Sequence, residues 1–592
     1  MKRIVLSVCA AMVLLWGNAD AQQYRAGIPW SQADQTGIIR SQTVPVITTE
    51  TPDYAKAKEE DRINSGGRYR VGLNVPVHYD MNNSGVFTYL DNGAKIWRTA
   101  IRTPGALAID VTFDKFNLPK GVAMYLTNAN GKQLEGSFTY IDNTDNYSVP
   151  LIQGDVINIE VDIPAGIQTS DIDFIINNVC AYYRGGIINS LNMQFGDYGN
   201  GQAMAEESGV VTADGCHINA VCPPEAWNFH ALKQTAAHIF MNGYVCSGNL
   251  INNTSLDCTP LFLTASHCDD GLGTTNTHFS SWKFYFNYEY ANCNGGGSAP
   301  TTNYLTGAKF RARSLFNPGP QYPSLIGDFL LLELRDATNK LGNQYDAYLG
   351  GWDRLTLAPN GTNFIDFHHP GGDPKKLSVF NQVQANGTFN QNAVPNTHWA
   401  AHLELGGIEG GSSGSALFVM STGRIIGDLS GGANDPEGPC GGNTPSLYSK
   451  ISRNWDYPEG EGDPMYRLKD HLDPAGTNAN SLNTYKVSGG NTPNCEETSV
   501  SINEAAALEE GITIYPNPSN GIVNLRVNLA NSTVLNIEVV NITGARTGVY
   551  KTTGKVQSGE VMVDLSALPN GIYMLRISSD RATVGKKVVL NR

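Results

Sequence analysis

Short runs of alternating apolar and polar residues fill much of the chain, and this period of two predicts β-strands. The clearest run is Val156–Val161, which reads Val-Ile-Asn-Ile-Glu-Val. Comparable runs separated by turn residues extend from Gly66 to about Pro164, and again from Ile512 toward the end of the chain. We expect each of these two segments to form a small β-sandwich.

The central part of the chain has a few more regular patterns. Phe329–Leu334 is almost uncharged and predicts a buried strand, and Phe418–Gly427 predicts a hairpin. Near the end of this part, Leu468 and Leu472 lie four apart, and Pro474 stops the pattern, which indicates a short terminal helix.

Composition and charge narrow the class of protein. The 592 residues exceed what a single core usually holds, so several domains are expected. Only 16% of residues are charged, 63 are glycine and the formal net charge is -14. This balance favours β-rich extracellular domains and argues against binding to nucleic acid.

The first residues have the pattern of a secretory signal peptide. Lys2 and Arg3 precede an apolar run, Ile4–Trp16, and Ala19-Asp20-Ala21 forms a small-residue cleavage site. The run is shorter than the roughly 20 residues that span a bilayer, and no later segment is long and apolar enough, so no stable membrane span is expected. We expect residues 1–21 to be removed on export.

Most of the ten cysteines gather in one part of the chain, and export favours disulfides there. The chain has no CxxC pair and no HExxH motif, so no metal site is expected. The six clustered cysteines are Cys216, Cys222, Cys246, Cys268, Cys293 and Cys440.

Three local motifs together suit peptide hydrolysis, which needs a nucleophile, a base, a group that orients the base and donors for an oxyanion. His267 follows an apolar strand and is the candidate general base. Asp328 precedes the buried strand, where an ionised carboxylate needs a partner such as His267. Ser413 lies in a Gly/Ser loop and is the candidate nucleophile, with the amides of Gly411 and Ser413 as the oxyanion hole. The order His, Asp, Ser is that of the chymotrypsin-type triad.

Two other functions remain open. An inactive, surface-displayed binding protein on a protease fold would keep the same architecture. An esterase of the α/β-hydrolase type would have the order Ser, Asp, His and a helix after the nucleophile, where this chain predicts a hairpin. Acyl transfer to water requires no cofactor, so we expect none.

Several short motifs lie between about Gly209 and Pro474. They are Gly215-Cys216, Cys222-Pro223, Cys246-Ser247-Gly248, Ser266-His267-Cys268, Gly327-Asp328-Phe329, Gly351-Trp352-Asp353-Arg354, His368-His369-Pro370 and Gly411-Ser412-Ser413-Gly414-Ser415. Together they resemble the bacterial lysyl endopeptidase family. The resemblance implies an all-β domain of two six-stranded antiparallel barrels with the triad between them. It also implies disulfides joining Cys216 to Cys440, Cys222 to Cys293 and Cys246 to Cys268, and leaves Cys180, Cys258 and Cys495 unassigned.

The two ends of the chain carry their own resemblances. Trp97–Ile101, Pro104-Gly105-Ala106 and Phe113–Pro119 resemble the pro-regions of such proteases. Ile512–Pro518, Asn520-Gly521 and Leu568–Tyr573 resemble the sorting domain of type IX secretion cargo, which implies contact with outer-membrane secretion machinery. The expected division is a signal peptide (1–21), a pro-region with a β-sandwich (22–207), a trypsin-like protease domain (208–486), a linker (487–510) and a C-terminal β-sandwich for sorting (511–592).

These resemblances imply a secreted or cell-surface endopeptidase that acts on proteins or peptides, exported through the periplasm and across the outer membrane. Its substrate pocket departs from the family. Aligned on Tyr448-Ser449-Lys450-Ile451, Ser446 replaces the aspartate that meets the substrate ammonium, and Ser430 replaces the histidine ahead of Gly431-Gly432. Asp428, Asp435 or Glu437 could supply a substitute charge, with Asp428 preferred because it lies on the strand leading to this wall.

Two further features bear on activation and specificity. Ser412 replaces the aspartate that pairs with the freed N-terminus in many animal relatives, so that activation switch is not expected. No lysine or arginine lies between Arg184 and Lys233, so a strictly lysine- or arginine-specific enzyme could not cut itself near Glu207. We therefore expect a protease that is not strictly lysine-specific.

Overall fold

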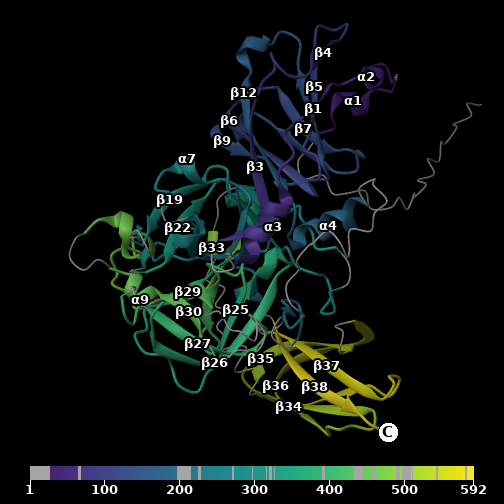
Figure 1. Ribbon diagram of the computed structural model, residues 1–592. Coiled ribbons are helices and arrows are strands. Elements are labelled where there is room, and N and C mark those ends of the chain that lie inside the picture. Colours follow the sequence, from purple (N-terminus) through teal and green to yellow (C-terminus); the bar gives the residue numbers. More distant parts are fainter. Residues whose placement is uncertain are drawn as a thin grey trace, which may run out of the picture.

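The structure is a computed structural model, and most of its regular structure is β-sheet in three successive parts (Figure 1). It describes residues 27–592 except 36, 64–67, 197–214, 224–228, 270–272, 296–297, 315, 319–322, 326, 336, 390–393, 433–443, 457–461, 489–493, 497–507, 510, 542–544 and 580–582. The expected signal peptide, Cys440, Asp435 and Glu437 lie outside the described residues.

The N-terminal part is a two-sheet sandwich, as the alternating pattern predicts. One sheet has the order β1-β5-β11-β7-β8 with β4 against β5, and the other has the order β10-β6-β12-β3 with β9 against β6. Their facing apolar residues, among them Trp97, Phe113 and Phe174, form one core. The strands are β1 (Val46–Thr48), β3 (Gly72–Tyr79), β4 (Val86–Tyr89), β5 (Lys95–Arg102), β6 (Ala108–Asn117), β7 (Ala123–Asn128), β8 (Leu134–Phe138), β9 (Thr144–Ser148), β10 (Ile152–Gln153), β11 (Val156–Ile163) and β12 (Asp173–Tyr182).

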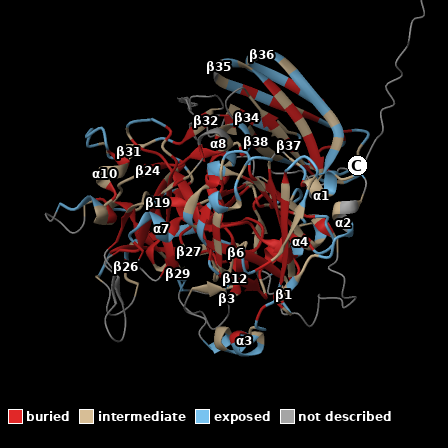
Figure 2. Cartoon of the chain, turned by 90° about the horizontal axis from the view of Figure 1, so that it is seen from above, coloured by how far each residue is buried: buried red, intermediate tan, exposed pale blue. Residues whose placement is uncertain are grey.

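Short helices flank this sandwich. The exposed helix α3 projects from the molecule in Figure 2, whereas α4 buries Ile187, Ile188 and Leu191 against the protease part. The helices of this part are α1 (Trp30–Ala33), α2 (Ile38–Ser41), α3 (Tyr54–Ile63), η1 (Tyr140–Asp142), η2 (Thr169–Asp171) and α4 (Gly186–Phe195).

The central part contains two antiparallel barrels. The second closes into the expected six-stranded ring, in the order β28-β25-β26-β27-β30-β29 with β29 paired back to β28. The first has eight strands rather than six, in the order β18-β17-β14-β15-β16-β22-β19. Its extra members are the short β18 and β2 (Tyr69–Arg70), which arrives from the N-terminal part and pairs with β15.

The elements of this part follow the chain in order. The first-barrel strands are β14 (Ala236–Met241), β15 (Tyr244–Ile251), β16 (Leu261–Ala265), β17 (Lys283–Phe286), β18 (Tyr304–Thr306), β19 (Ala308–Arg313) and β22 (Phe329–Leu334). The second-barrel strands are β25 (Phe364–His368), β26 (Lys376–Gly387), β27 (His398–Leu405), β28 (Ala416–Val419), β29 (Arg424–Gly432) and β30 (Ser446–Lys450). Smaller elements are β13 (Ile218–Asn219), α6 (His230–Lys233), η3 (Ser266–Asp269), α7 (Asn276–Phe279), β20 (Phe316–Pro318), β21 (Pro323–Leu325), α8 (Thr338–Asn343), β23 (Tyr348–Leu349), β24 (Gly351–Asp353), η4 (Pro370–Gly372), α9 (Ile451–Asn454), η5 (Pro464–Tyr466), α10 (Lys469–Leu472), β31 (Ser481–Leu482) and β32 (Tyr485–Ser488).

The expected linker is partly ordered as sheet. Strand β33 (Asn494–Glu496) pairs with β32, so backbone hydrogen bonds hold part of 487–510 against the protease part. The C-terminal part is one five-stranded sheet in which the long β35 bridges β34 and β37, with β36 alongside (Figure 1). Its strands are β34 (Ile512–Tyr515), β35 (Ile522–Asn541), β36 (Arg546–Asp564), β37 (Gly571–Ser578) and β38 (Thr583–Leu590).

Candidate active site

His267 and Asp328 meet because two neighbouring strands end beside each other. The fully buried β16 leads into the turn that carries His267, and β22 begins directly after Asp328. These strands pair antiparallel with Ala265 opposite Phe329, which brings the two ends together. The Nδ1 of His267 is 2.7 Å from Oδ2 of Asp328, and the His267 amide donates to Oδ1 at 3.0 Å.

This contact sets the charge preference of the imidazole. Burial lowers the pKa of His267, but the Asp328 carboxylate favours the protonated ring, and the pKa ends above its ordinary value. Asp328 is fully buried, and its amide donates to Ser449 Oγ at 2.9 Å. With its main chain anchored in this way, Asp328 can hold one orientation of the His267 ring through its buried carboxylate.

Ser413 lies on a loop between β27 and β28, tied to β15. The Ser413 carbonyl accepts from the Ser247 amide at 2.8 Å, and the Ser247 hydroxyl donates to the Gly411 carbonyl at 2.8 Å. A Cβ at Gly414 would lie 2.1 Å from Thr264 Oγ1, so this position needs glycine for the loop to pack on β16. In the described chain, the amides of Gly411 and Ser413 have no hydrogen-bond acceptor, as an oxyanion hole requires.

The Cys246–Cys268 disulfide connects strand β15 to the turn that carries His267. Cys246 precedes Ser247, which holds the Ser413 loop, and Cys268 follows His267. The structure also contains the Cys222–Cys293 disulfide. Cys216 is disulfide-bonded, and its expected partner lies outside the described residues.

Two of the three cysteines left unassigned by the sequence have a defined state, and the side chain of Cys495 lies outside the described part of the structure. Cys258 is disulfide-bonded as well, and Cys180 is a buried free thiol. Cys180 lies under the junction of the N-terminal and central parts, since a Cβ at Gly72 would come within 2.8 Å of its sulfur.

The predicted pocket residues gather on two adjacent strands. β29 and β30 pair so that Gly432 faces Ser446, with Ser430 nearby on the same wall. The hydroxyl of Ser430 is 2.9 Å from Nε2 of His398, a residue that sequence analysis did not single out.

Asp428 lies apart from the other predicted pocket residues. It pairs with Ser449 beside Asp328, away from the Gly432–Ser446 end, and its carboxylate has no hydrogen-bond partner among the described residues. Burial, and next the charge of Asp328, raises its pKa well above the ordinary value. This shift favours the uncharged form of the Asp428 carboxyl.

Sequence analysis also missed Asp366. Its Oδ2 accepts hydrogen bonds from Ser415 Oγ at 2.6 Å and from Tyr448 Oη at 2.8 Å. Burial raises the pKa of Asp366 to about 7. The sequence around Asp366 is an ordinary apolar strand, so no local signal points to these buried hydrogen bonds.

The neighbours Ser412 and His368 have structural roles. Their side chains are 2.8 Å apart, and Nε2 of His368 is 3.0 Å from Ser378 Oγ. Among the described residues, no group of three or more His, Cys, Asp or Glu could hold a metal ion. No helix in the described chain is long and apolar enough to cross a membrane.

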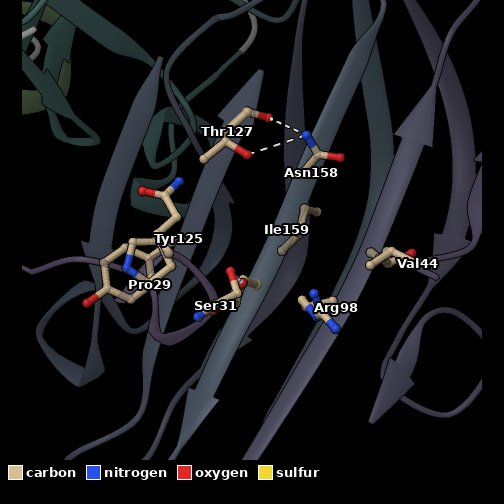
Figure 3. A pocket seen from close by; sticks show the side chains of 11 residues that line it. Pro29, Ser31, Val44, Arg98, Tyr125, Thr127, Asn158 and Ile159 are labelled. Atoms are coloured by element: carbon tan, nitrogen blue, oxygen red, sulfur yellow. Dashed lines mark hydrogen bonds between the residues drawn. The ribbon is translucent and has the colours of Figure 1, made fainter. Parts of the chain in front are cut away.

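A separate pocket lies on the N-terminal sandwich, far along the chain from the triad. It measures about 190 Å³ and is lined by Arg98, Tyr125, Asn158 and Glu160, with Pro29 and Ser31 of the N-terminal segment over it. Asn158 donates to the backbone and the hydroxyl of Thr127 across its floor (Figure 3).

Comparisons with known proteins agree with this architecture. Residues 210–448 match the family model described as lysyl endopeptidase, C-terminal domain, and residues 513–591 match the secretion system C-terminal sorting domain. A lysyl endopeptidase of Pseudomonas aeruginosa is 27% identical over 358 residues, which cover 57% of this chain and 69% of the relative.

Two solved structures are similar to part of this chain. A secreted serine protease of Vibrio cholerae has 13% identity and a TM-score of 0.22, covering 60% of this chain and 69% of its own. A chymotrypsin of Cellulomonas bogoriensis has 14% identity and a TM-score of 0.19, covering 36% of this chain and 88% of its own. The chain is therefore similar to lysyl endopeptidases over its central part and to secretion sorting domains over residues 513–591, which supports a secreted or cell-surface peptidase.

Proposed function

We propose that this protein is a serine endopeptidase that works through an acyl-enzyme on Ser413. The observation that carries the proposal is the buried Asp328 carboxylate bonded to both the ring and the amide of His267. This arrangement leaves Nε2 of His267 as the site that exchanges a proton with the nucleophile.

The reaction would proceed in two stages, acylation of Ser413 and hydrolysis of the acyl-enzyme. Ser413 Oγ attacks the carbonyl carbon while His267 Nε2 takes its proton, and the amides of Gly411 and Ser413 donate to the oxyanion. The intermediate collapses, the C–N bond breaks and His267 returns the proton to the leaving amine. Water then attacks the acyl-enzyme with the same proton exchange and frees the acid.

We also propose that the enzyme is not strictly lysine-specific. Ser446 and Ser430 leave this wall of the pocket neutral, and a buried substrate ammonium without a charged partner loses several kcal/mol of discrimination. The uncharged form favoured at Asp428 supports this view.

The domain plan is part of the proposal. The mature enzyme would lack the pro-region, 22–207, and the sorting domain, 511–592, after export by the outer-membrane secretion machinery. The substrates would be proteins or peptides.

An active-site-directed fluorophosphonate label tests the mechanism. The processed protein should give one labelled band that disappears in Ser413→Ala and persists in Ser421→Ala, a change at an exposed serine of the same part. Label retained in Ser413→Ala would refute Ser413 as nucleophile.

A further inference from the structure

A strand of the N-terminal part enters the first barrel beside the candidate active site. β2 pairs antiparallel with the start of β15, with Tyr69 opposite Val245 and Arg70 opposite Tyr244. Immediately after this pairing, β15 reaches Cys246 and Ser247, which anchor the His267 and Ser413 loops. β2 therefore pairs with β15 directly before the residues that anchor the two loops of the candidate triad.

Arg68 precedes this strand and contacts the ring of Tyr244. Its guanidinium carbon is 4.0 Å from the centre of the Tyr244 ring, the geometry of a cation–π contact. Burial and Asp328 dominate the pKa of His267, and the positive charge of Arg68 acts on it as well, in the lowering direction. Arg68 thus lies within electrostatic range of the imidazole.

Tyr69 covers the start of the nucleophile loop. A Cβ at Gly410 would lie 2.4 Å from Cδ2 of the Tyr69 ring, so the ring rests directly on backbone that leads to Gly411. The Arg184 guanidinium stacks at 4.3 Å from the Tyr69 ring centre. Burial raises the pKa of Tyr69 to about 12, which reflects how little water reaches its hydroxyl.

The positions of the two barrels indicate on which side of the scissile bond β2 lies. The expected pocket for the residue before the scissile bond is on β29 and β30 of the second barrel, whereas β2 lies on β15 of the first. An extended chain that adds to a sheet edge gains main-chain hydrogen bonds, and its alternate side chains select partners. The residues of β2 consequently occupy the positions expected for residues that follow the scissile bond.

The segment is also fixed in place by its neighbours. The amides of Val71 and Gly72 both donate to the Gly243 carbonyl, at 2.7 and 2.9 Å. The buried Lys283 of β17 bonds Asp110 of β6 at 2.6 Å, which joins the two parts. Tethering of this kind gives a docked segment a high effective concentration.

We propose that Tyr244, Val245 and Gly410 form the subsites for the substrate residues after the scissile bond, and that Arg68–Arg70 fills them in the unprocessed chain. Tyr244 favours a cationic side chain at the first of these positions, and the surface of Gly410 favours an aromatic one at the second. The N-terminal part is then a built-in competitor that blocks the site until it is removed. This inference rests on the proposed serine protease function.

The test compares fluorophosphonate labelling rates of the full-length and processed protein. Full-length protein should label at least tenfold more slowly than processed protein. Arg68→Glu and Tyr69→Ala should each raise the full-length rate at least tenfold. Arg62→Ala, at an exposed position that precedes the strand, should leave it unchanged. Arg68→Glu keeps the test valid if Tyr69→Ala does not fold.

The outcomes separate the two proposals. Equal labelling of full-length wild type and Arg68→Glu would overturn the blocking role, while labelling of processed protein would still support the proposed function. Absence of label in every form would refute the proposed function itself.

A peptide library tests the Tyr244 subsite. Peptides cut by processed protein should be enriched in Lys or Arg directly after the cleaved bond, and Tyr244→Ala should reduce this enrichment several-fold. An unchanged profile would refute the Tyr244 subsite.

Discussion

The Asp328 carboxylate holds His267 at two points, because one oxygen accepts from the main-chain amide at 3.0 Å and the other lies 2.7 Å from Nδ1. A single contact would let the ring pivot, whereas two contacts fix both the turn and the imidazole. The carboxylate has no exposure to solvent, so it is not screened by water.

Replacing triad residues should abolish activity without unfolding the protein. We expect Ser413→Ala, His267→Ala and Asp328→Asn each to lower kcat/KM by roughly three or more orders of magnitude, because they act as one unit. His402→Ala, at a partly exposed position on β27, is the matched control for His267. Peptidase assays with thermal melts would decide, and near-normal activity in any triad variant would contradict the assignment.

The acid limb of activity should follow the charge of Asp328. Because the pKa of His267 lies above its ordinary value, kcat/KM should fall with acid at a pH above the roughly 6.5 typical of histidine. In Asp328→Asn the residual activity should have its acid limb at lower pH, since the amide carries no charge. A pH–rate profile with the same limb in both proteins would argue against this electrostatic coupling.

The disulfide beside the base should affect both stability and catalysis. Cys246 and Cys268 close a loop with a sequence separation of 22, which corresponds to about 3 kcal/mol in the chain-entropy estimate. Cys246→Ala with Cys268→Ala should lower both the unfolding midpoint and kcat. Cys222→Ala with Cys293→Ala should lower the midpoint and leave kcat nearly unchanged, as measured by urea unfolding and initial rates. Loss of kcat in both pairs alike would exclude a specific role for the first.

The ion pair between the N-terminal and central parts should be costly to break. The side chains of Lys283 and Asp110 are 0% and 2% exposed. Lys283→Met leaves a buried carboxylate without its cation, which typically costs about 3–5 kcal/mol. Lys115→Met breaks the exposed contact with Asp173, which water screens, and should cost far less. Chemical unfolding of full-length protein would measure both, and equal losses would contradict the role of burial.

Stability should depend on pH through Asp366. Burial raises its folded pKa to about 7, whereas an unfolded aspartate titrates near 3.9. Between these values the folded state alone holds the proton, so its contribution to the unfolding free energy is full below about pH 4 and is lost as pH rises to about 7. Asp366→Asn should flatten this dependence, and exposed Asp91→Asn should not. Urea unfolding at several pH values would show it; an unchanged slope in Asp366→Asn would contradict it.

Specificity should be broader than that of lysyl endopeptidases. Cleavage of a proteome-derived peptide library should place fewer than about nine in ten cuts after lysine, since Ser446 and Ser430 carry no charge. Ser446→Asp should raise the lysine share, because it restores a buried partner for the ammonium. A share above about nine in ten in the natural protein would show that another group binds lysine.

The sequence by itself determined the residue types of the site and most of the β architecture. Alternation such as Val156–Val161 identifies strands because successive side chains point to opposite faces of a sheet, although in this strand the polar Glu160 is buried as well. The motifs around His267, Asp328 and Ser413 are local, since each role needs a particular side chain in a particular turn. The strand β33 inside the expected linker was not foreseen, because its pairing with β32 is not encoded by its own three residues.

Only the tertiary structure decided which distant groups share a buried environment. Asp366 meets Ser415 and Tyr448 through the closed second barrel, and Asp428 lies beside Asp328 because of the register of β29 and β30. The contact of Tyr69 with Gly410 joins residues from different parts of the chain. Such contacts depend on strand register and on the packing of whole domains, and these energies are summed over many residues, so no short motif reports them.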